Sequence, residues 1–487
     1  MASIEEHVPD HQVESRDAYF LGIKFKNVRT PMVQVAIVGL TAFMTVGMSI
    51  ALGGAGGGGL LDTTQSDAAG TAVAATFAAV SFFAGTIYNR VGVRICLMFG
   101  GFGYAVVVAA FLCTAHILNR ATPFVIIAGI MEGFSASLLW AAQGAVCMSY
   151  PMEADKGKAF ALFWTLFQLG SVIGSIITLC LEWTPKAVNT SDTTYAVFII
   201  IIVIGCFVPL LLSPSNKVIR KDGTHVVVPA MPTWKSEIMG MLRILWEDKW
   251  IITIFPFFFS SNYFYTYQGN DYNAGNFTLR TRYFNALWGN LFNMAGAWIM
   301  GVALDFKPKR FSRKVRARVG LIFIFIYTIL IWGLGWTVVK NMSRTNVITP
   351  LVDLDQGARY ARYLMLYVFW CFYDGMYQAY AYWLMGSLSN NSQRLSHYAG
   401  WYKSFQQAGA AIAYRLDGLR TSYYKMYIST WMILVFGVLS TTWVSFTKVQ
   451  NHTDDEPIVM GEDKLGKEET IVQVEEIPKV ADEVRAV

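Results

Sequence analysis

The chain has 487 residues, of which 54% are hydrophobic, 15% aromatic and only 15% charged. Soluble proteins carry about 25% charged residues, so this composition excludes a soluble globule, a disordered chain and a fibrous repeat. The formal net charge is +6, although residues 448–487 hold eleven acidic and only five basic side chains. The composition therefore predicts an all-α integral membrane protein with a basic body and an acidic tail.

Twelve apolar segments are long enough to cross a bilayer as helices. They cover residues 31–53, 68–88, 95–114, 123–148, 159–182, 194–213, 251–270, 283–304, 319–339, 362–386, 398–416 and 423–446. The polar connection 214–250 divides them into two six-helix halves, 31–213 and 251–446. The N-terminal tail, 1–30, lacks the apolar core of a signal peptide. The C-terminal tail, 447–487, has no aromatic residue and is expected to be disordered.

The distribution of lysine and arginine predicts the orientation. If the N-terminus is cytosolic, the cytoplasmic segments before the tail hold 22 basic residues, and the opposite loops hold roughly a third as many. Both termini are therefore expected in the cytosol, with the protein in the plasma membrane or an endomembrane. The same topology explains the basic body without nucleic-acid binding. It also places three glycosylation sequons on the outer side, at Asn189, Asn276 and Asn341.

The sequence contains no motif whose context fits catalysis, a cofactor or a metal ion. The cysteines and histidines form no ligand cluster, so neither a metal nor a cofactor is expected. Residues 54–59 match GxGxxG, but they follow a membrane helix rather than a strand and are expected to form a flexible outer loop. Residues 461–467 match GxxxxGK, but Glu468 replaces the serine or threonine that binds magnesium. The protein is therefore not expected to be an enzyme.

A charged motif follows the second predicted span. Its residues are Gly85, Asn89, Arg90, Gly92 and Arg94. The spacing resembles the G-x-x-x-D-R-x-G-x-[RK] gating signature of the major facilitator superfamily, with asparagine in the aspartate position. A degenerate copy ends at Asp305 after the eighth span, at the matching place in the second half. This resemblance implies two parallel six-helix repeats and alternating access.

Three longer stretches resemble the fungal branch of the Unc-93-like family, a divergent branch of that superfamily. They are GFSASLLWAAQG (133–144), FWTLFQLG (163–170) and PFFFSSNYFYTYQGND (256–271). The resemblance extends over residues 31–446. Its animal members include a protein linked to a potassium-channel complex and an escort of Toll-like receptors, whereas fungal members are transporter-like proteins of unassigned substrate.

Two acidic residues fall deep in predicted spans, Glu132 in the fourth and Asp374 in the tenth. Charged groups at this depth are costly, so each is a functional candidate by default. The resemblance implies that both face the central cavity, where they could carry a proton or a cationic substrate. The competing interpretation is a protonated acid that links neighbouring helices.

Amide and tyrosine side chains complete the candidate substrate or proton site. They are Gln143, Gln168, Gln406, Tyr373 and Tyr377. The amides could equally join helices, and the tyrosines either belong to interfacial belts or flank Asp374 as an aromatic cavity. Lys403 is expected to extend to the cytosolic interface.

These features predict a membrane transporter of an unassigned small molecule or ion, with proton coupling and natural-product efflux as two specific forms. The alternative is a non-transporting regulator or escort of another membrane protein. The expected partners are the lipid bilayer and an unidentified substrate, with a membrane-protein partner under the alternative.

Overall fold

The structure is a computed structural model. It describes residues 18–20, 23–25, 27–60, 63–152, 155–183, 189–226, 234–305, 311–340, 342–344, 351–389 and 392–451. The predicted acidic tail lies almost entirely outside these residues, as does Asn341.

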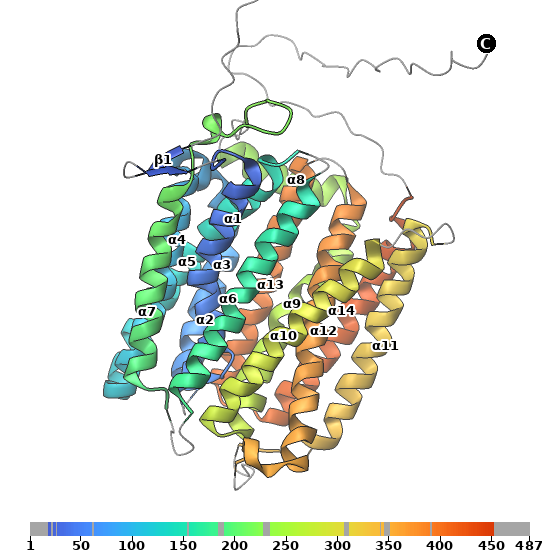
Figure 1. Ribbon diagram of the computed structural model, residues 1–487. Helices are drawn as coiled ribbons and strands as arrows, with labels where there is room; N and C mark the ends of the chain where they lie inside the picture. Colours follow the sequence, from blue (N-terminus) through green and yellow to red (C-terminus); the bar gives the residue numbers. More distant parts are fainter. Residues whose placement is uncertain are drawn as a thin grey trace, which may run out of the picture.

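Each half of the chain forms six long helical segments, which run side by side along the bundle (Figure 1). The first half contains α1 (Pro31–Ala42), η1 (Phe43–Gly47) and α2 (Met48–Gly53) as one segment, then α3 (Thr64–Val91), α4 (Val93–Ile117), α5 (Thr122–Ser149), α6 (Lys156–Leu181) and α7 (Asp192–Phe207). The second half contains α9 (Ile251–Thr266) and η7 (Tyr267–Ala274) as one segment, then α10 (Leu279–Asp305), α11 (Arg313–Val339), α12 (Ala358–Leu388), α13 (Ser392–Gly418) and α14 (Tyr423–Thr447). All twelve predicted spans are found as helices.

Apolar composition explains most of these helices. Within the described part of the chain, nine helices are long and apolar enough to cross a membrane. The other three segments, α9, α12 and α13, carry many of the buried polar side chains. Each half has its own hydrophobic core, and the first core also takes in Leu279 and Tyr283 of α10.

Corresponding glycines show the repeat in three dimensions. A Cβ atom at Gly133 of α5 would lie 2.3 Å from the carbonyl oxygen of Val73 on α3. One at Gly375 of α12 would lie 2.0 Å from the carbonyl oxygen of Asn293 on α10. Each glycine follows one of the two buried acids, so the same close helix contact occurs beside the acid in both halves.

The basic end of the bundle is the end where α3 and α10 finish and α11 begins. The predicted loop 214–250 is largely structured here. Arg220 donates to the carbonyl oxygens of Ser149 and Tyr150, which end α5, at 2.8 and 3.1 Å. Further along, Trp234–Glu247 forms helix α8. The N-terminal tail also contains a short antiparallel hairpin, β1 (Ala18–Phe20) with β2 (Ile23–Phe25).

At the opposite end, the predicted flexible loop 54–59 is instead largely buried between the halves. Gly56 has φ +75°, and a Cβ atom there would lie 2.1 Å from the carbonyl oxygen of Gly269 on η7. Asn273 of η7 donates to the carbonyl oxygen of Gly54 at 2.8 Å. The glycines allow the two backbones to meet, so the expectation of a flexible loop was wrong.

The connection before α12 is held at the same end by Asp353. Its carboxylate accepts two bonds from Arg280, at 2.8 and 2.7 Å, and one from Thr281 at 2.7 Å. Burial acts to raise the pKa of Asp353, but these hydrogen bonds outweigh it and hold the pKa well below its usual range. Asp353 is therefore a charged structural link within the second half.

Candidate functional site

Asp374 lies near the middle of α12, where 3% of its surface is exposed. Its Oδ2 atom accepts hydrogen bonds from the hydroxyl of Tyr265 at 2.8 Å and from Nδ2 of Asn293 at 2.6 Å. These donors come from α9 and α10. Tyr265 is itself 38% exposed, so the buried carboxyl has an accessible neighbour. A carboxylate at this depth is tolerable because donors replace the water it has lost.

A chain of amides continues from Asp374 into α13. Gln378, one turn further along α12, donates to Asp374 at 3.3 Å. Its Oε1 atom accepts from Nε2 of Gln406 at 3.0 Å and also from the hydroxyl of Tyr402. The predicted amide of Gln406 is thereby linked to the predicted acid through one intervening glutamine.

Lys403 ends this chain inside an aromatic cage. Its Nζ atom donates to Gln406 at 3.0 Å and lies 5.1, 5.7 and 5.4 Å from the ring centres of Trp140, Tyr382 and Tyr402. Trp140 belongs to α5, so the cage spans the two halves. The expectation that Lys403 extends to the interface was wrong, because three π faces and an amide stabilise the ammonium group within the bundle.

Asn293 also connects the site to the first half. Its Oδ1 atom accepts from Nε2 of Gln168 on α6 at 2.9 Å, while its Nδ2 atom donates to Asp374. Nearby, Asn290 donates to Oγ of Ser175 on α6 at 3.2 Å. The side-chain amide of Asn293 therefore bonds both to α6 and to Asp374, so a movement of α6 would change the hydrogen bonding of Asp374.

The remaining predicted site residues lie elsewhere. Tyr373 accepts from Thr328 at 2.8 Å, and Tyr377 bonds to Ser260 at 2.6 Å, so both hydroxyls point into the core of the second half. Tyr377 also stacks on Phe257 with 4.0 Å between ring centres. The structure does not form the predicted aromatic cavity from these two tyrosines.

Glu132 and Gln143, both on α5, are also separate from the Asp374 network. Glu132 is 8% exposed and lies near Tyr104 and Tyr414. Gln143 donates to Sγ of Cys147 one turn away, at 3.4 Å. The two predicted acids therefore occupy matching positions in the repeat without sharing a site.

Comparison with known proteins identifies the family. The profile described as Major Facilitator Superfamily matches residues 31–414. An UNC93-like protein of Schizosaccharomyces pombe is 39% identical over 435 residues, which cover 88% of this chain and 86% of the relative. The chain belongs to the UNC93-like branch of the major facilitator superfamily. The family resemblance in the sequence is thus confirmed.

Two further relatives and one solved structure are also similar to this UNC93-like chain. UNC93-like protein 1 of Arabidopsis thaliana is 35% identical, over 88% of this chain and 92% of the relative. The notoamide biosynthesis cluster protein O' of Aspergillus versicolor is 26% identical, over 80% and 83%. The structure of a D-xylose–proton symporter matches with a TM-score of 0.61 at 12% identity, over 87% of this chain and 99% of that one, which confirms the predicted fold.

The predicted gating motif of the UNC93-like chain lies at the basic end. Gly92 has φ +86° and separates α3 from α4, and Arg90 is exposed. Arg94 donates through Nε to the carbonyl oxygen of Leu212, after α7, at 2.9 Å. In the second half, Arg318 donates to the carbonyl oxygen of Phe446 in α14 at 2.9 Å. Both arginines thus join the third helix of a half to its sixth, a repeat that the motif comparison missed.

The second motif copy makes contacts of its own. Asp305 accepts from Nε1 of Trp383 at 3.2 Å, which joins the end of α10 to α12. Gly85 lies within α3. Asn89 lies within α3 as well, and its side chain is outside the described part of the structure.

The sequons differ in accessibility. Asn189 is exposed, whereas Asn276 is 1% exposed and donates to the carbonyl oxygen of Tyr272 at 2.6 Å. The folded structure leaves no room for a glycan on this buried, hydrogen-bonded nitrogen, which argues against the prediction for Asn276.

Sequence reasoning missed two groups of polar residues. Asn293 was overlooked because a lone amide within a span carries no charge to mark it, and Lys403 was dismissed because lysines are common near helix ends. A buried ionic cluster at the opposite end, built on Asp67, Asp271 and Asp417, was missed because each aspartate lies within a turn or two of a predicted helix end. A search for acids flanking several spans at one end would have named these three aspartates, although not their contacts.

Proposed function

We propose that this UNC93-like protein is a secondary transporter of a small organic molecule, with Asp374 as its central polar group. The observation that carries the proposal is the path from Asp374 through Asn293 to Gln168, which crosses from one half to the other. A rocking motion of the halves breaks or remakes this path, so the hydrogen bonding of Asp374 differs between the two states.

The path gives a simple coupling scheme. When α6 moves away from α10, Asn293 loses its bond from Gln168. Its amide can then turn from Asp374, which leaves the carboxylate to bind a proton or a donor group of the substrate. Occupation of Asp374 by either ligand thus favours one arrangement of the halves, which is the requirement for coupled transport.

The surroundings support an organic substrate. The site joins one carboxylate to four amides, and the cage around Lys403 adds flat aromatic surfaces. The name of the Aspergillus versicolor relative places that protein in a biosynthesis cluster, which supports natural-product efflux as the narrower form of the proposal. We further propose that the basic end faces the cytosol, as the positive-inside rule requires.

The test is metabolite profiling of a deletion strain complemented with the wild type, Asp374→Asn or Asp355→Asn. Asp355 is the matched control, because its side chain is 72% exposed and lies outside the network. We expect the control to restore the wild-type pattern inside and outside the cell. We expect Asp374→Asn to reach the membrane at normal levels and to leave the deletion pattern uncorrected.

One feature favours the alternative of a non-transporting regulator or escort, which is the asparagine at position 89 in place of the signature aspartate. Full complementation by Asp374→Asn would support that alternative and refute a transport role for the network.

A further inference from the structure

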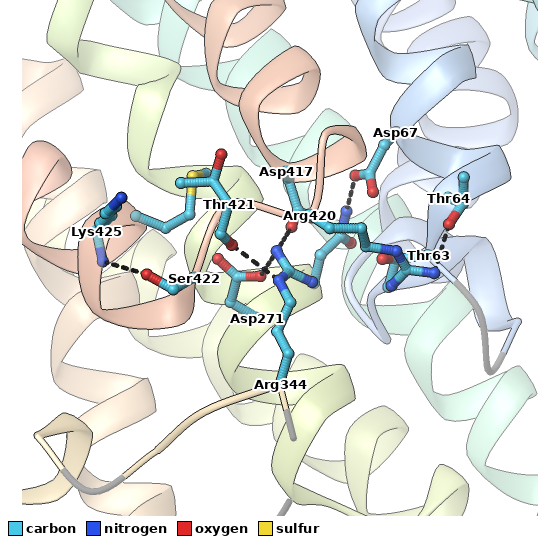
Figure 2. Close-up of polar contacts among 12 residues, drawn as sticks. Thr63, Thr64, Asp67, Asp271, Arg344, Asp417, Arg420, Thr421, Ser422 and Lys425 are labelled. Atoms are coloured by element: carbon cyan, nitrogen blue, oxygen red, sulfur yellow. Dashed lines mark hydrogen bonds and ion pairs between the residues drawn. The ribbon is translucent and has the colours of Figure 1, made fainter. Parts of the chain in front are cut away.

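A second buried ionic site lies at the opposite end of the bundle, far along the helices from Asp374. Arg344, in the connection between α11 and α12, pairs with Asp271 of η7 at 3.1 Å and with Asp417 of α13 (Figure 2). The guanidinium also donates to the carbonyl oxygen of Thr421 at 2.8 Å and lies over the ring of Tyr423. This group belongs wholly to the second half.

The first half contributes a third carboxyl, Asp67 of α3, which points toward the pair formed by Arg344 and Asp417 (Figure 2). Its Oδ1 atom accepts from Nδ2 of Asn270 at 2.6 Å. Its Oδ2 atom is buried without a donor among the described residues, and its side chain packs against the end of α13 next to Asp417. The helices are tightly packed here, since a Cβ atom at Gly418 would lie 3.3 Å from Cβ of Asp67.

The charges of this cluster do not balance. Asp67, Asp271 and Asp417 are 1%, 0% and 0% exposed, and the guanidinium of Arg344 pairs with Asp271 and Asp417 but not with Asp67. Each also keeps one oxygen, Oδ2, without a donor among the described residues. Two carboxylates in contact away from water repel each other unless they share a proton or bind a cation.

We propose that Asp67 and Asp417 share a proton, and that this proton holds the two halves together at the opposite end. The site is independent of the transport proposal, because it uses none of the residues around Asp374. No group of three or more acidic, histidine or cysteine residues within the described chain is arranged to hold a metal ion. A proton is the ligand that two neighbouring buried carboxyls can share without further ligands.

The contacts around the cluster explain why the proton would act on the whole interface. Asn270 donates to Asp67 and accepts from the backbone N–H of Gly57 at 2.9 Å, so it touches the first half twice. Arg420, just after α13, donates to Thr64 at 2.6 Å. Loss of the shared proton places like charges on opposite sides of this interface and weakens these neighbouring contacts.

None of the described ion pairs joins Asp67 to a positive side chain, although other titratable groups face the cluster. They are Tyr267 on η7, Tyr414 on α13, Tyr423 on α14 and the arginine Arg420, whose described hydrogen bond goes to Thr64. Tyr414 also lies near Glu132, an acid of the first half.

The experiment measures the separation of the halves against pH. Spin labels are attached to Thr193→Cys at the start of α7 and Ala358→Cys at the start of α12, both exposed positions, in the full chain with its six native cysteines replaced. Distances are recorded in lipid nanodiscs from about pH 5 to about pH 9. We expect the population with the longer distance to rise at least about fivefold across this range.

Asp67→Asn removes the titration while keeping the shape of the neutral acid, so its short distance should persist at every pH. Asp353→Asn is the matched control, because Asp353 is a buried acid at the same end whose partners all belong to the second half. It should retain the wild-type pH response. Gel filtration and thermal unfolding verify that each variant is folded.

Three outcomes would overturn the proposal. The first is a wild-type distance that does not change with pH, which needs no variant and so stands even if Asp67→Asn fails to fold. The second is a folded Asp67→Asn protein with the wild-type response. The third is a distance that follows sodium, replaced by choline at constant pH, because the ligand would then be a metal cation.

Discussion

Gly375→Ala adds one methyl group where α12 meets α10, beside Asp374. The new Cβ atom would lie 2.0 Å from the carbonyl oxygen of Asn293, whereas ordinary contacts begin at 3.4 Å, so the helices must separate by about 1.4 Å. Overpacking of this kind destabilises a protein by about 1–3 kcal/mol, and the higher helix propensity of alanine offsets up to about 1 kcal/mol of that loss. The shift also stretches the 2.6 Å bond from Asn293 to Asp374, which is worth about 1.5–3 kcal/mol when the acceptor is charged. We expect a net loss of about 2–4 kcal/mol.

The assay is thermal unfolding of purified protein in one detergent. The measured quantity is the fraction of protein that stays monodisperse at each temperature. Gly386→Ala is the control on the same helix, because no atom lies within 4 Å of its added Cβ. It should unfold at or slightly above the wild-type temperature. Gly133→Ala meets a carbonyl oxygen at 2.3 Å in the first half, so it should lose stability without disturbing Asp374. Equal unfolding temperatures for Gly375→Ala and Gly386→Ala would refute this reasoning.

Three further results are expected. Asp353→Asn should destabilise the protein by about 1–3 kcal/mol near neutral pH. Because the folded-state pKa of Asp353 is lowered, the stabilisation by its carboxylate is present above about pH 4 and is lost on acidification. The unfolding temperatures of variant and wild type should therefore converge as the pH falls below about 4. Arg94→Ala and Arg318→Ala should each cost about 1–3 kcal/mol by uncapping a helix end, measured by the same unfolding assay, and unequal losses would contradict their equivalence. Glycosidase treatment should shift the wild type and an Asn276→Gln variant equally on a gel, and should leave the double variant Asn189→Gln/Asn341→Gln unshifted.

The sequence by itself determined the helices and their order. Twelve apolar segments were predicted, and the helices other than α8 reproduce them within a few residues, because a bilayer requires about 20 apolar residues per span. Repeated local patterns, such as the acid–glycine pairs at Glu132 and Asp374, also predicted two related halves. Both signals are local along the chain, so they can be read without knowing which helices touch.

Only the tertiary structure decided which polar groups meet. Asp374 and Gln406 were predicted as candidates, but the amide of Asn293 that links them to the other half comes from a helix with no acidic residue near that depth. Tyr373 and Tyr377 neighbour Asp374 in sequence yet turn into the core, because a helix presents successive residues to different partners. The cluster of Asp67, Asp271 and Asp417 gathers three helix ends that are 204 and 146 residues apart in the chain. Helix packing between the halves creates that proximity, and no local pattern encodes it.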